Sequence, residues 1–436
     1  MERTYKKLRE KSITSIFGKV EMERMGYGSP GEESLFPKDA VLNLSEDSYS
    51  HGVRKLVALE ASRGSFEDAI ESVERATGVK VPKRQAQQLT EKAAMDFDGF
   101  YNDGSTSEQA KAAANALPIL ALSMDGKGIV MRREDLKEAT REKAEQTSPK
   151  LKKRLSKGEK RNAKRMATVA SVYSIDTFVR TPEQIAGEFS PAKPVEPVRR
   201  PKPAAKRVWA SIEKEPEDVI KEIFKEALRR DPQLKRKWVC LVDGNRKQLI
   251  KLKSAAKRHK VAVTLVLDII HVIEYLWKAS RVFHEETSTE AEKWVSHRLL
   301  EILRGRASHI AAGMRRSATL QGVKKTDRKP VDICAGYLLR NKAYLHYDRY
   351  LKQGFPIATG VIEGACRHLI KDRMDVTGAR WTLQGAEAVL KLRSLKSSGD
   401  FNAYWEYHEA QEFARNHGPR YAKPSILNKL RLNLPQ

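Results

Sequence analysis

Two mostly apolar segments that each end in Asp-Gly constrain the fold of this chain most. They read LPILALSMDG at residues 117–126 and KWVCLVDG at residues 237–244. Short apolar runs of this kind are typical of buried strands, and helical patterns lie around the second one. The alternation predicts an α/β core in which Asp125 and Asp243 end two strands.

A glycine follows each of these aspartates. Because glycine has no Cβ, it allows the chain to turn sharply where a strand ends. Gly126 and Gly128 therefore predict a turn after Asp125 and then a second short strand. We expect further strands at 166–176 and 261–273, and helices at 215–230 and 246–258.

A third carboxylate, Glu363, opens an expected helix after a glycine-containing turn in ATGVIEGACRHLIKDRM. It lies more than a hundred residues from Asp243, so the three carboxylates meet in the fold or not at all. A phosphodiester can be cleaved between two Mg²⁺ ions held by a few carboxylates. The alternative for any single Asp-Gly is an ordinary turn residue.

The charge of the chain favours a polyanionic partner. Its 436 residues carry a formal net charge of +26. The excess lies in the middle: residues 131–166 hold fourteen lysines and arginines against six acidic residues, and residues 229–260 hold twelve against two. Nucleic acid is the usual partner of such a chain, and a solvated basic surface or a ribosome-associated protein is the alternative.

The cysteines and the N-terminus indicate the compartment. Cys240, Cys334 and Cys366 are far apart and lack CxxC spacing, so neither a disulfide framework nor a zinc site is predicted. No signal peptide and no membrane-spanning apolar run is recognisable. These features favour the cytoplasm.

Three helices are expected between residues 51 and 95. Ser65 and Asp68 form a capping box for the second helix, and Pro82 starts the third. The pair resembles a helix-turn-helix, whose Lys83, Arg84 and Gln87 would contact DNA. Any small helical bundle could give the same pattern.

The order strand-Asp, two strands, helix, strand-Asp, helix, strand, helical insertion and helix-Glu resembles DDE transposases with an RNase H-like core. The block GFPIATGVIEGACRHLIKDRMDVTGARW, at 354–381, resembles bacterial insertion-sequence transposases of the ISKra group, within the Mutator-like set. RGSFEDAIESVERATGVKVPKRQA and KRMATVASVYSID do so too. The resemblance covers roughly residues 12–410.

This resemblance implies Mg²⁺-dependent cleavage at transposon ends and strand transfer into target DNA. Asp125, Asp243 and Glu363 would be the catalytic, metal-binding triad for two Mg²⁺ ions, for which Mn²⁺ can substitute. An Asp-x-x-His motif, Asp268 to His271 at the end of the strand at 261–273, would support the site. A core histidine is the alternative role for His271.

Basic side chains near these positions are expected to contact DNA. Arg367 lies four residues after Glu363 on the same helix face and could reach a phosphate. The remaining expected contacts are Lys127, Arg246, Lys247, Lys371, Arg373, Arg380 and Trp381. Solvated loops are the alternative for the lysines and arginines beside the aspartates, and core packing is the alternative for Trp381.

The expected domains are an N-terminal, mostly helical DNA-binding region (1–112), an RNase H-like core (113–271 and 357–400) with a basic insertion (131–207), a helical insertion (272–356) and a tail (401–436). The expected partners are double-stranded DNA, as terminal inverted repeats and target, and further copies of the chain in a dimer or larger oligomer. The nucleoid of a bacterial cytoplasm would be the location. A structure-specific nuclease or resolvase, and a non-catalytic DNA-binding protein derived from a transposase, remain alternatives.

Overall fold

The computed structural model describes residues 5–103, 117–146, 162–189, 199–376 and 378–421. It is a mixed α/β fold that divides into two compact units. The first unit comprises Met1–Ser107, Gly128–Arg165 and His368–Gln436, and the second comprises Glu108–Lys127 and Met166–Arg367. Within the expected basic insertion at 131–207, residues 147–161 and 190–198 lie outside the described residues, and the described remainder includes one strand of the larger sheet and the start of another.

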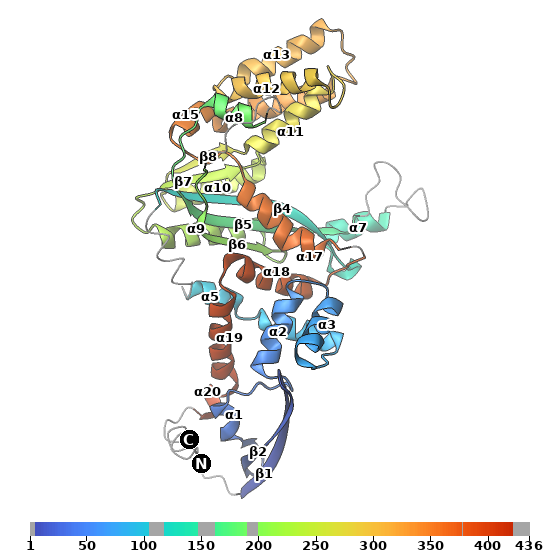
Figure 1. The fold of residues 1–436 in the computed structure, drawn as a ribbon, viewed down its shortest axis with the longest axis vertical. Coiled ribbons are helices and arrows are strands. Elements are labelled where there is room, and N and C mark those ends of the chain that lie inside the picture. The colour runs from blue at the N-terminus through green and yellow to red at the C-terminus, as the bar shows by residue number, and fades with distance from the viewer. Residues whose placement is uncertain (1–4, 104–116, 147–161, 190–198, 377, 422–436) are drawn as a thin grey trace. The chain divides into compact units, whose positions relative to one another are not determined.

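The second unit contains a five-stranded sheet in the order β6-β5-β4-β7-β8 (Figure 1). Its strands β4 and β7 pair in parallel, as do β7 and β8, whereas β5 and β6 are antiparallel. The bounds are β4 Ile119–Val130, β5 Lys164–Ile175, β6 Ala204–Ser211, β7 Lys237–Val242 and β8 Val263–Leu267. Ile119 to Met124 and Trp238 to Val242 are all buried, which explains their continuous apolar runs.

The expected turn after Asp125 is wrong. Strand β4 continues through Gly126 and Gly128 to Val130, and neither glycine has a positive φ. Gly244, after Asp243, does adopt the left-handed conformation, with φ +87°. Glycine permits a turn without imposing one, so the same Asp-Gly pair lies inside one strand and beyond the end of the other.

Helices surround this sheet and extend beyond it. The expected helices at 215–230 and 246–258 are confirmed as α9 (Pro216–Arg230) and α10 (Arg246–Arg258). The segment after β8 is largely helical, as expected, and α11 to α14 pack against one another (Figure 1). The remaining bounds in this unit are α8 Pro182–Glu188, α11 Ile269–Ser280, α12 Thr289–Leu303, α13 Ala307–Leu320, α14 Lys329–Arg340, α15 Tyr347–Lys352 and α16 Gly360–Ala365.

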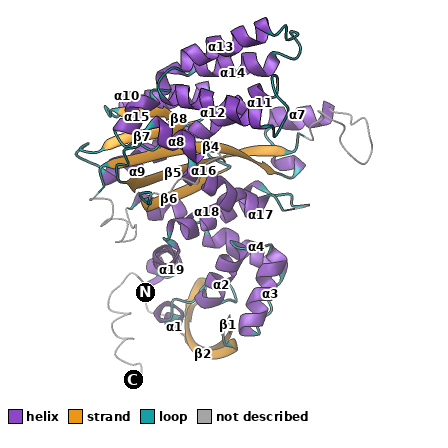
Figure 2. Ribbon diagram, turned by 45° about the horizontal axis from the view of Figure 1, so that its top comes forward, coloured by secondary structure: helices purple, strands orange, loops and turns teal. Residues whose placement is uncertain are grey.

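The first unit combines a small antiparallel sheet with helices from both ends of the chain (Figure 2). Its core packs α2, α3 and α4 around buried Val53, Val57 and Val73. The capping box of Ser65 and Asp68 is confirmed at the start of α3. The bounds are β1 Tyr5–Ser15, β2 Gly18–Ser29, β3 Glu32–Leu35, α1 Pro37–Val41, α2 His51–Ala61, α3 Phe66–Thr77, α4 Lys83–Ala93, α5 Phe97–Asn102, α7 Glu138–Gln146, α17 Asp372–Met374, α18 Leu383–Ser398, α19 Phe401–Asn416 and α20 Gly418–Tyr421.

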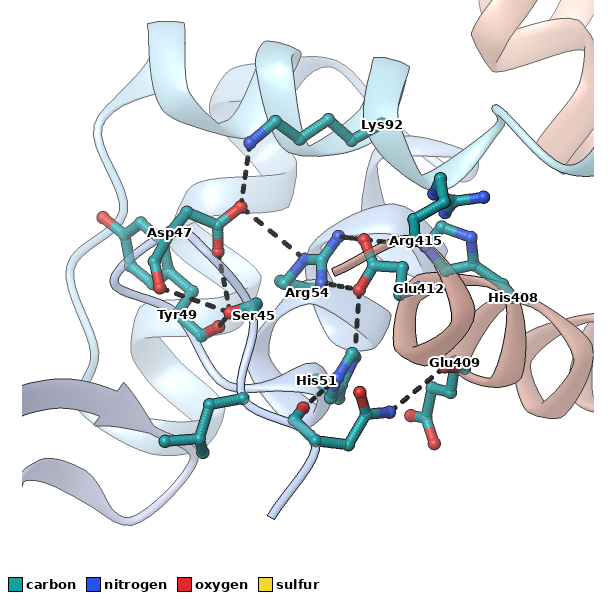
Figure 3. Close-up of polar contacts among 12 residues, drawn as sticks. Ser45, Asp47, Tyr49, His51, Arg54, Lys92, His408, Glu409, Glu412 and Arg415 are labelled. Carbon is teal, nitrogen blue, oxygen red and sulfur yellow. Dashed lines mark hydrogen bonds and ion pairs between the residues drawn. The ribbon is translucent and has the colours of Figure 1, made fainter. Parts of the chain in front are cut away.

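A buried ion-pair network joins α2 to α19 within this unit (Figure 3). Arg54 is 2% exposed and donates through two nitrogens to the carboxylate of Glu412. His51 lies 3.5 Å from the same carboxylate, and His408 lies 3.7 Å from it. Because buried charges are costly unless they are paired, this network fixes how α19 docks on α2.

None of the helices in the described ranges is long and apolar enough to cross a membrane.

Candidate active site

Three aspartates lie in one row across three neighbouring parallel strands of the second unit. Strand β4 pairs with β7 up to Ser123 opposite Leu241, and two further steps on each strand reach Asp125 and Asp243. Strand β7 pairs with β8 up to Val242 opposite Leu267, so the next step brings Asp243 level with Asp268. The Asp268 N–H donates to the Val242 carbonyl at 2.8 Å, which continues the pairing to this level. Neighbouring strands lie about 4.8 Å apart, so the backbones of the three aspartates are close together.

Asp125 is half-buried within β4. Its Oδ1 accepts a hydrogen bond from the Gly126 N–H at 2.6 Å. Its Oδ2 accepts one from the Cys366 thiol, with Sγ at 3.3 Å. Burial, and then the nearby Asp125 carboxylate, raise the pKa of Cys366, so this thiol stays protonated and can donate. Sequence patterns did not predict Cys366 here, although its position three residues after Glu363 on the helix was available as a signal.

Asp243 follows the last residue of β7 and is held mainly through its backbone. Its carbonyl accepts a hydrogen bond from the Tyr337 hydroxyl at 2.9 Å, and its Oδ1 accepts one from the Asn245 N–H at 2.8 Å. Asn245 caps α10, so the strand end passes directly into this helix. Burial raises the pKa of Tyr337, and the charges of Asp243 and Asp268 add to this effect. The distant Tyr337, from the helical insertion, could not have been predicted from local patterns.

Asp268 is fully buried and caps α11. Its carboxylate accepts hydrogen bonds from the Thr359 hydroxyl, from the Thr359 N–H at 3.3 Å and from the Ile270 N–H at 3.1 Å. Burial raises the pKa of Asp268, whereas these hydrogen bonds oppose the rise. Asp268 thereby ties the end of β8 to the residue that precedes α16.

The expected position of His271 at the end of a strand is wrong. Strand β8 ends at Leu267, and His271 lies in the first turn of α11 because Asp268 starts this helix. Its Nε2 lies 4.0 Å from Asp268, and its Nδ1 lies 3.8 Å from Glu274. The side chain is half-buried, so it is not an ordinary core histidine.

Glu363 lies on α16, four residues after Thr359. Partial burial raises the pKa of this carboxyl, and the charges of Asp268, Glu274 and Asp125 raise it further, whereas His271 opposes them. The helix that Glu363 was expected to open is present, and a π-helical turn at Cys366–Lys371 connects α16 to α17. Such turns are frequent at functional sites.

Among the described residues, the carboxylates of the expected triad are not paired with the basic side chains near them. Asp125, Asp243 and Glu363 form no ion pair within the described ranges. Exposed Lys127 follows Asp125, and exposed Arg246 and Lys247 follow Asp243; Arg367 is exposed on the turn after Glu363. Within the part of the chain that the structure describes, no three His, Cys, Asp or Glu side chains converge closely enough to hold a metal ion.

The other expected DNA contacts belong to the first unit. Lys83, Arg84, Lys371 and Arg380 are exposed, and Gln87 is half-buried.

Two further expected contacts, Arg373 and Trp381, are buried, with exposures of 4% and 7%. The guanidinium of Arg373 lies over the Trp381 ring, 4.7 Å from its centroid, and Trp381 donates from Nε1 to the Met374 carbonyl at 3.1 Å. Trp381 is therefore packed in the core, as the alternative interpretation predicted.

Comparison with known proteins does not assign this chain to a family. No family model matches the chain, and no curated protein matches it. A solved chain of the Drosophila P element transposase strand transfer complex is similar to it at 10% identity, over 89% of this chain and 92% of that chain, with a TM-score of 0.26. A score this low does not assign a shared fold.

Proposed function

We propose that this chain is a DNA transposase that uses Asp125, Asp243 and Glu363 to cut and join DNA. The observation that carries the proposal is the strand register that brings Asp125 of β4 level with Asp243 and Asp268, which directly follow β7 and β8. If Asp125 and Asp243 were only turn residues, their alignment on adjacent strands without an ion-pair partner among the described residues would have no structural reason. The ISKra-group, Mutator-like assignment rests on the sequence blocks given above.

The order of elements supports an RNase H-like core. Apart from the short helices α7 and α8 between the first three strands, the order along the chain is β4 with Asp125, β5, β6, α9, β7 followed by Asp243, α10 and β8, and then helices up to α16 with Glu363. This is the order that the sequence resemblance implies. The sheet order, with β4 central, brings the first and fourth strands together and so makes the two aspartates neighbours.

The side chains of the proposed triad offer the type of ligand atom that Mg²⁺ binds. Carboxylate oxygens are the ligands that Mg²⁺ prefers, and Asp125, Asp243 and Glu363 would hold it. When bound, Mg²⁺ would activate the attacking oxygen and neutralise the scissile phosphate, and Mn²⁺ could substitute for it. Because no three of these side chains converge here, the proposal requires them to close around the ions.

The remaining residues would orient the DNA. Asp268 holds Thr359 and so positions α16 and its Glu363. His271 lies 4.0 Å from Asp268, at the end of the row. From this position it would hold a terminal nucleotide or the scissile phosphate. Arg246, Lys247 and Lys127 would contact phosphates. Water would cut a strand at the transposon end, and the freed 3′-hydroxyl would then attack target DNA.

The proposed partners follow from this reaction. They are double-stranded DNA, as terminal inverted repeats and as target, and a second copy of the chain in a dimer or larger oligomer. The helical insertion would shield the DNA end or contribute to the dimer. The bacterial nucleoid is the corresponding location.

Metal binding separates the enzymatic alternatives from the non-catalytic one. Mn²⁺ binding to the DNA-free protein would be followed by electron paramagnetic resonance, which detects free Mn²⁺. We expect Asp125→Asn and Asp243→Asn to bind fewer Mn²⁺ ions than wild type. Asp176→Asn, a control just beyond β5, should bind as many as wild type. Equal binding by all four proteins would contradict the metal site and favour a DNA-binding relic. A structure-specific nuclease or resolvase would bind Mn²⁺ as well, and strand joining separates it from a transposase.

A further inference from the structure

A cavity of about 280 Å³ in the first unit has the features of an anion site. It is lined from three helices, α3, α4 and α18, and from the segments that carry Arg132, Arg373 and Arg380. Helices α3 and α4 pack on each other, and α4 packs on α18 (Figure 2). The cavity belongs wholly to the first unit, and none of its lining residues is part of the aspartate row.

All three helices contribute their first turns to this cavity. Ser65 is the N-cap of α3, Lys83 is the first residue of α4, and Thr382 is the N-cap of α18, and all of them line it. Each helix has eleven or more residues. The first-turn N–H groups of a helix lack carbonyl partners within that helix, and its dipole is positive there. Helix N-termini bind phosphate and sulfate for both reasons. Ser65 already accepts the Asp68 N–H and Thr382 already accepts the Gly385 N–H, so the remaining first-turn N–H groups and the dipoles would act on a ligand.

Close packing at Gly385 brings two of these helix starts together. A Cβ at Gly385 would lie 3.6 Å from the Gln87 amide nitrogen of α4 and 2.8 Å from the Thr382 hydroxyl. The distance to Gln87 shows that α4 packs directly on the first turn of α18, and the short distance to Thr382 shows that glycine leaves room for the capping hydroxyl. Both Gly385 and Gln87 line the cavity.

The charges of the lining favour an anion. The carboxylate of Glu67 is paired with Lys83, so these two charges offset each other. Arg132, Arg373 and Arg380 then leave a net formal charge of +3 on the lining. Arg132 and Arg380 are exposed and form no ion pair among the described residues.

Arg373 gives an independent observation that points to an anion. Its guanidinium is buried against the rings of Phe66 and Trp381, and its Nε donates to the Ala61 carbonyl at 3.2 Å. Its Nη2 is buried and has no hydrogen-bond partner within the described chain. A buried cationic donor is costly without an acceptor, so this nitrogen favours an anion in the cavity.

We propose that this cavity binds a phosphate group through the first turns of α3, α4 and α18 together with Arg132, Arg373 and Arg380. The volume suits one phosphate and its adjoining sugar, and is below that of most small-molecule sites. The phosphate comes from a DNA backbone or from a small phosphorylated ligand, which share this chemistry. The site does not depend on the proposed catalysis, since a chain that binds without cutting would also have it.

The test compares full-length wild type, Arg132→Ala and Arg380→Ala with Arg75→Ala. Arg75 is an exposed arginine in the last turn of α3, on the same unit but outside the cavity, so it controls for loss of one charge. Fluorescence anisotropy with a 5′-labelled duplex of random sequence would be measured over a range of salt concentrations. Each cavity variant should weaken binding about tenfold and lower the slope of log K against log salt by roughly 0.9, whereas Arg75→Ala should do neither.

A second arm distinguishes the source of the phosphate. Thermal unfolding would be compared in inorganic phosphate and in chloride at equal ionic strength, without DNA. Stabilisation of wild type by phosphate that Arg380→Ala abolishes, with no change in duplex binding, supports a small phosphorylated ligand. Weaker duplex binding by the cavity variants supports a backbone phosphate. Cavity variants that match Arg75→Ala in both arms would overturn the proposal.

Discussion

Asp125 and Asp243 lie level on neighbouring parallel strands, two residues beyond the paired Ser123 and Leu241. This relationship comes from the register of β4 against β7, because a shift by one residue would turn one carboxylate to the opposite face. Asp268, which directly follows β8, extends the row. The site is therefore a property of the sheet, and its chemistry depends on keeping that register.

The first prediction concerns the aspartates themselves. Asp125→Asn should reduce metal-dependent DNA cleavage about 1,000-fold, which corresponds to ~4 kcal/mol of lost transition-state stabilisation. The exposed Asp176, which follows β5, is the matched control, and Asp176→Asn should keep wild-type activity. Nicking of plasmid DNA in Mg²⁺ or Mn²⁺ measures both. Equal loss in the two variants would contradict a specific role for Asp125.

The second prediction concerns the link between Asp268 and Thr359. Thr359→Val keeps the side-chain shape but removes the hydroxyl that donates to the buried carboxylate. We expect a loss of about 1–3 kcal/mol of unfolding free energy, since the acceptor remains buried with one donor fewer. Urea unfolding measures it, with the exposed Thr289→Val as control. A stability unchanged from wild type would show that Asp268 does not depend on this bond.

Local signals predicted much of the fold, and long-range pairing explains the rest. The bounds of α9 and α10 and the capping box of Ser65 depend on neighbouring residues, so they were predictable. The course of β4 through Gly126 was not, because glycine allows both a turn and a strand. The row of aspartates depends on which strands pair, and the buried position of Arg373 depends on Phe66 from a distant helix. Neither is encoded locally.

The third prediction concerns the pH dependence of stability. Burial would raise the pKa of Glu226, but Arg207, Arg230 and Arg229 outweigh it and hold the pKa at about 2. Because the folded-state pKa lies below the ordinary value of 4.5, this carboxylate stabilises the fold above pH 4.5. That contribution, about 3 kcal/mol, is lost as the pH falls from 4.5 towards 2.

Glu226→Gln tests this window. The variant should be less stable than wild type at pH 7, and the difference should shrink between pH 4.5 and pH 2. Chemical unfolding at a series of pH values gives the difference directly. A difference in unfolding free energy that stays constant across the pH series would show that the arginines do not hold the pKa of Glu226 low.

The fourth prediction concerns the network in Figure 3. Glu412→Gln removes the charged partner of two nitrogens of the buried Arg54 guanidinium, leaves Asp47 at 3.9 Å as its ion-pair partner among the described residues, and should destabilise the protein by about 3–5 kcal/mol. Glu406 lies on the same helix and is exposed, so Glu406→Gln should have little effect. Denaturant midpoints of both variants give the comparison. Similar midpoints would mean that the network does not hold α19 on α2.

Strand transfer tests the central claim most directly. Purified wild type and Asp243→Ala would be mixed with Mg²⁺, a target plasmid and labelled DNA from the segments that flank the gene. We predict that only wild type joins labelled ends to the plasmid. Cleavage without joining would contradict the transposase and favour a nuclease, and binding with neither reaction, for every flanking segment, would contradict the catalytic role of the aspartate row.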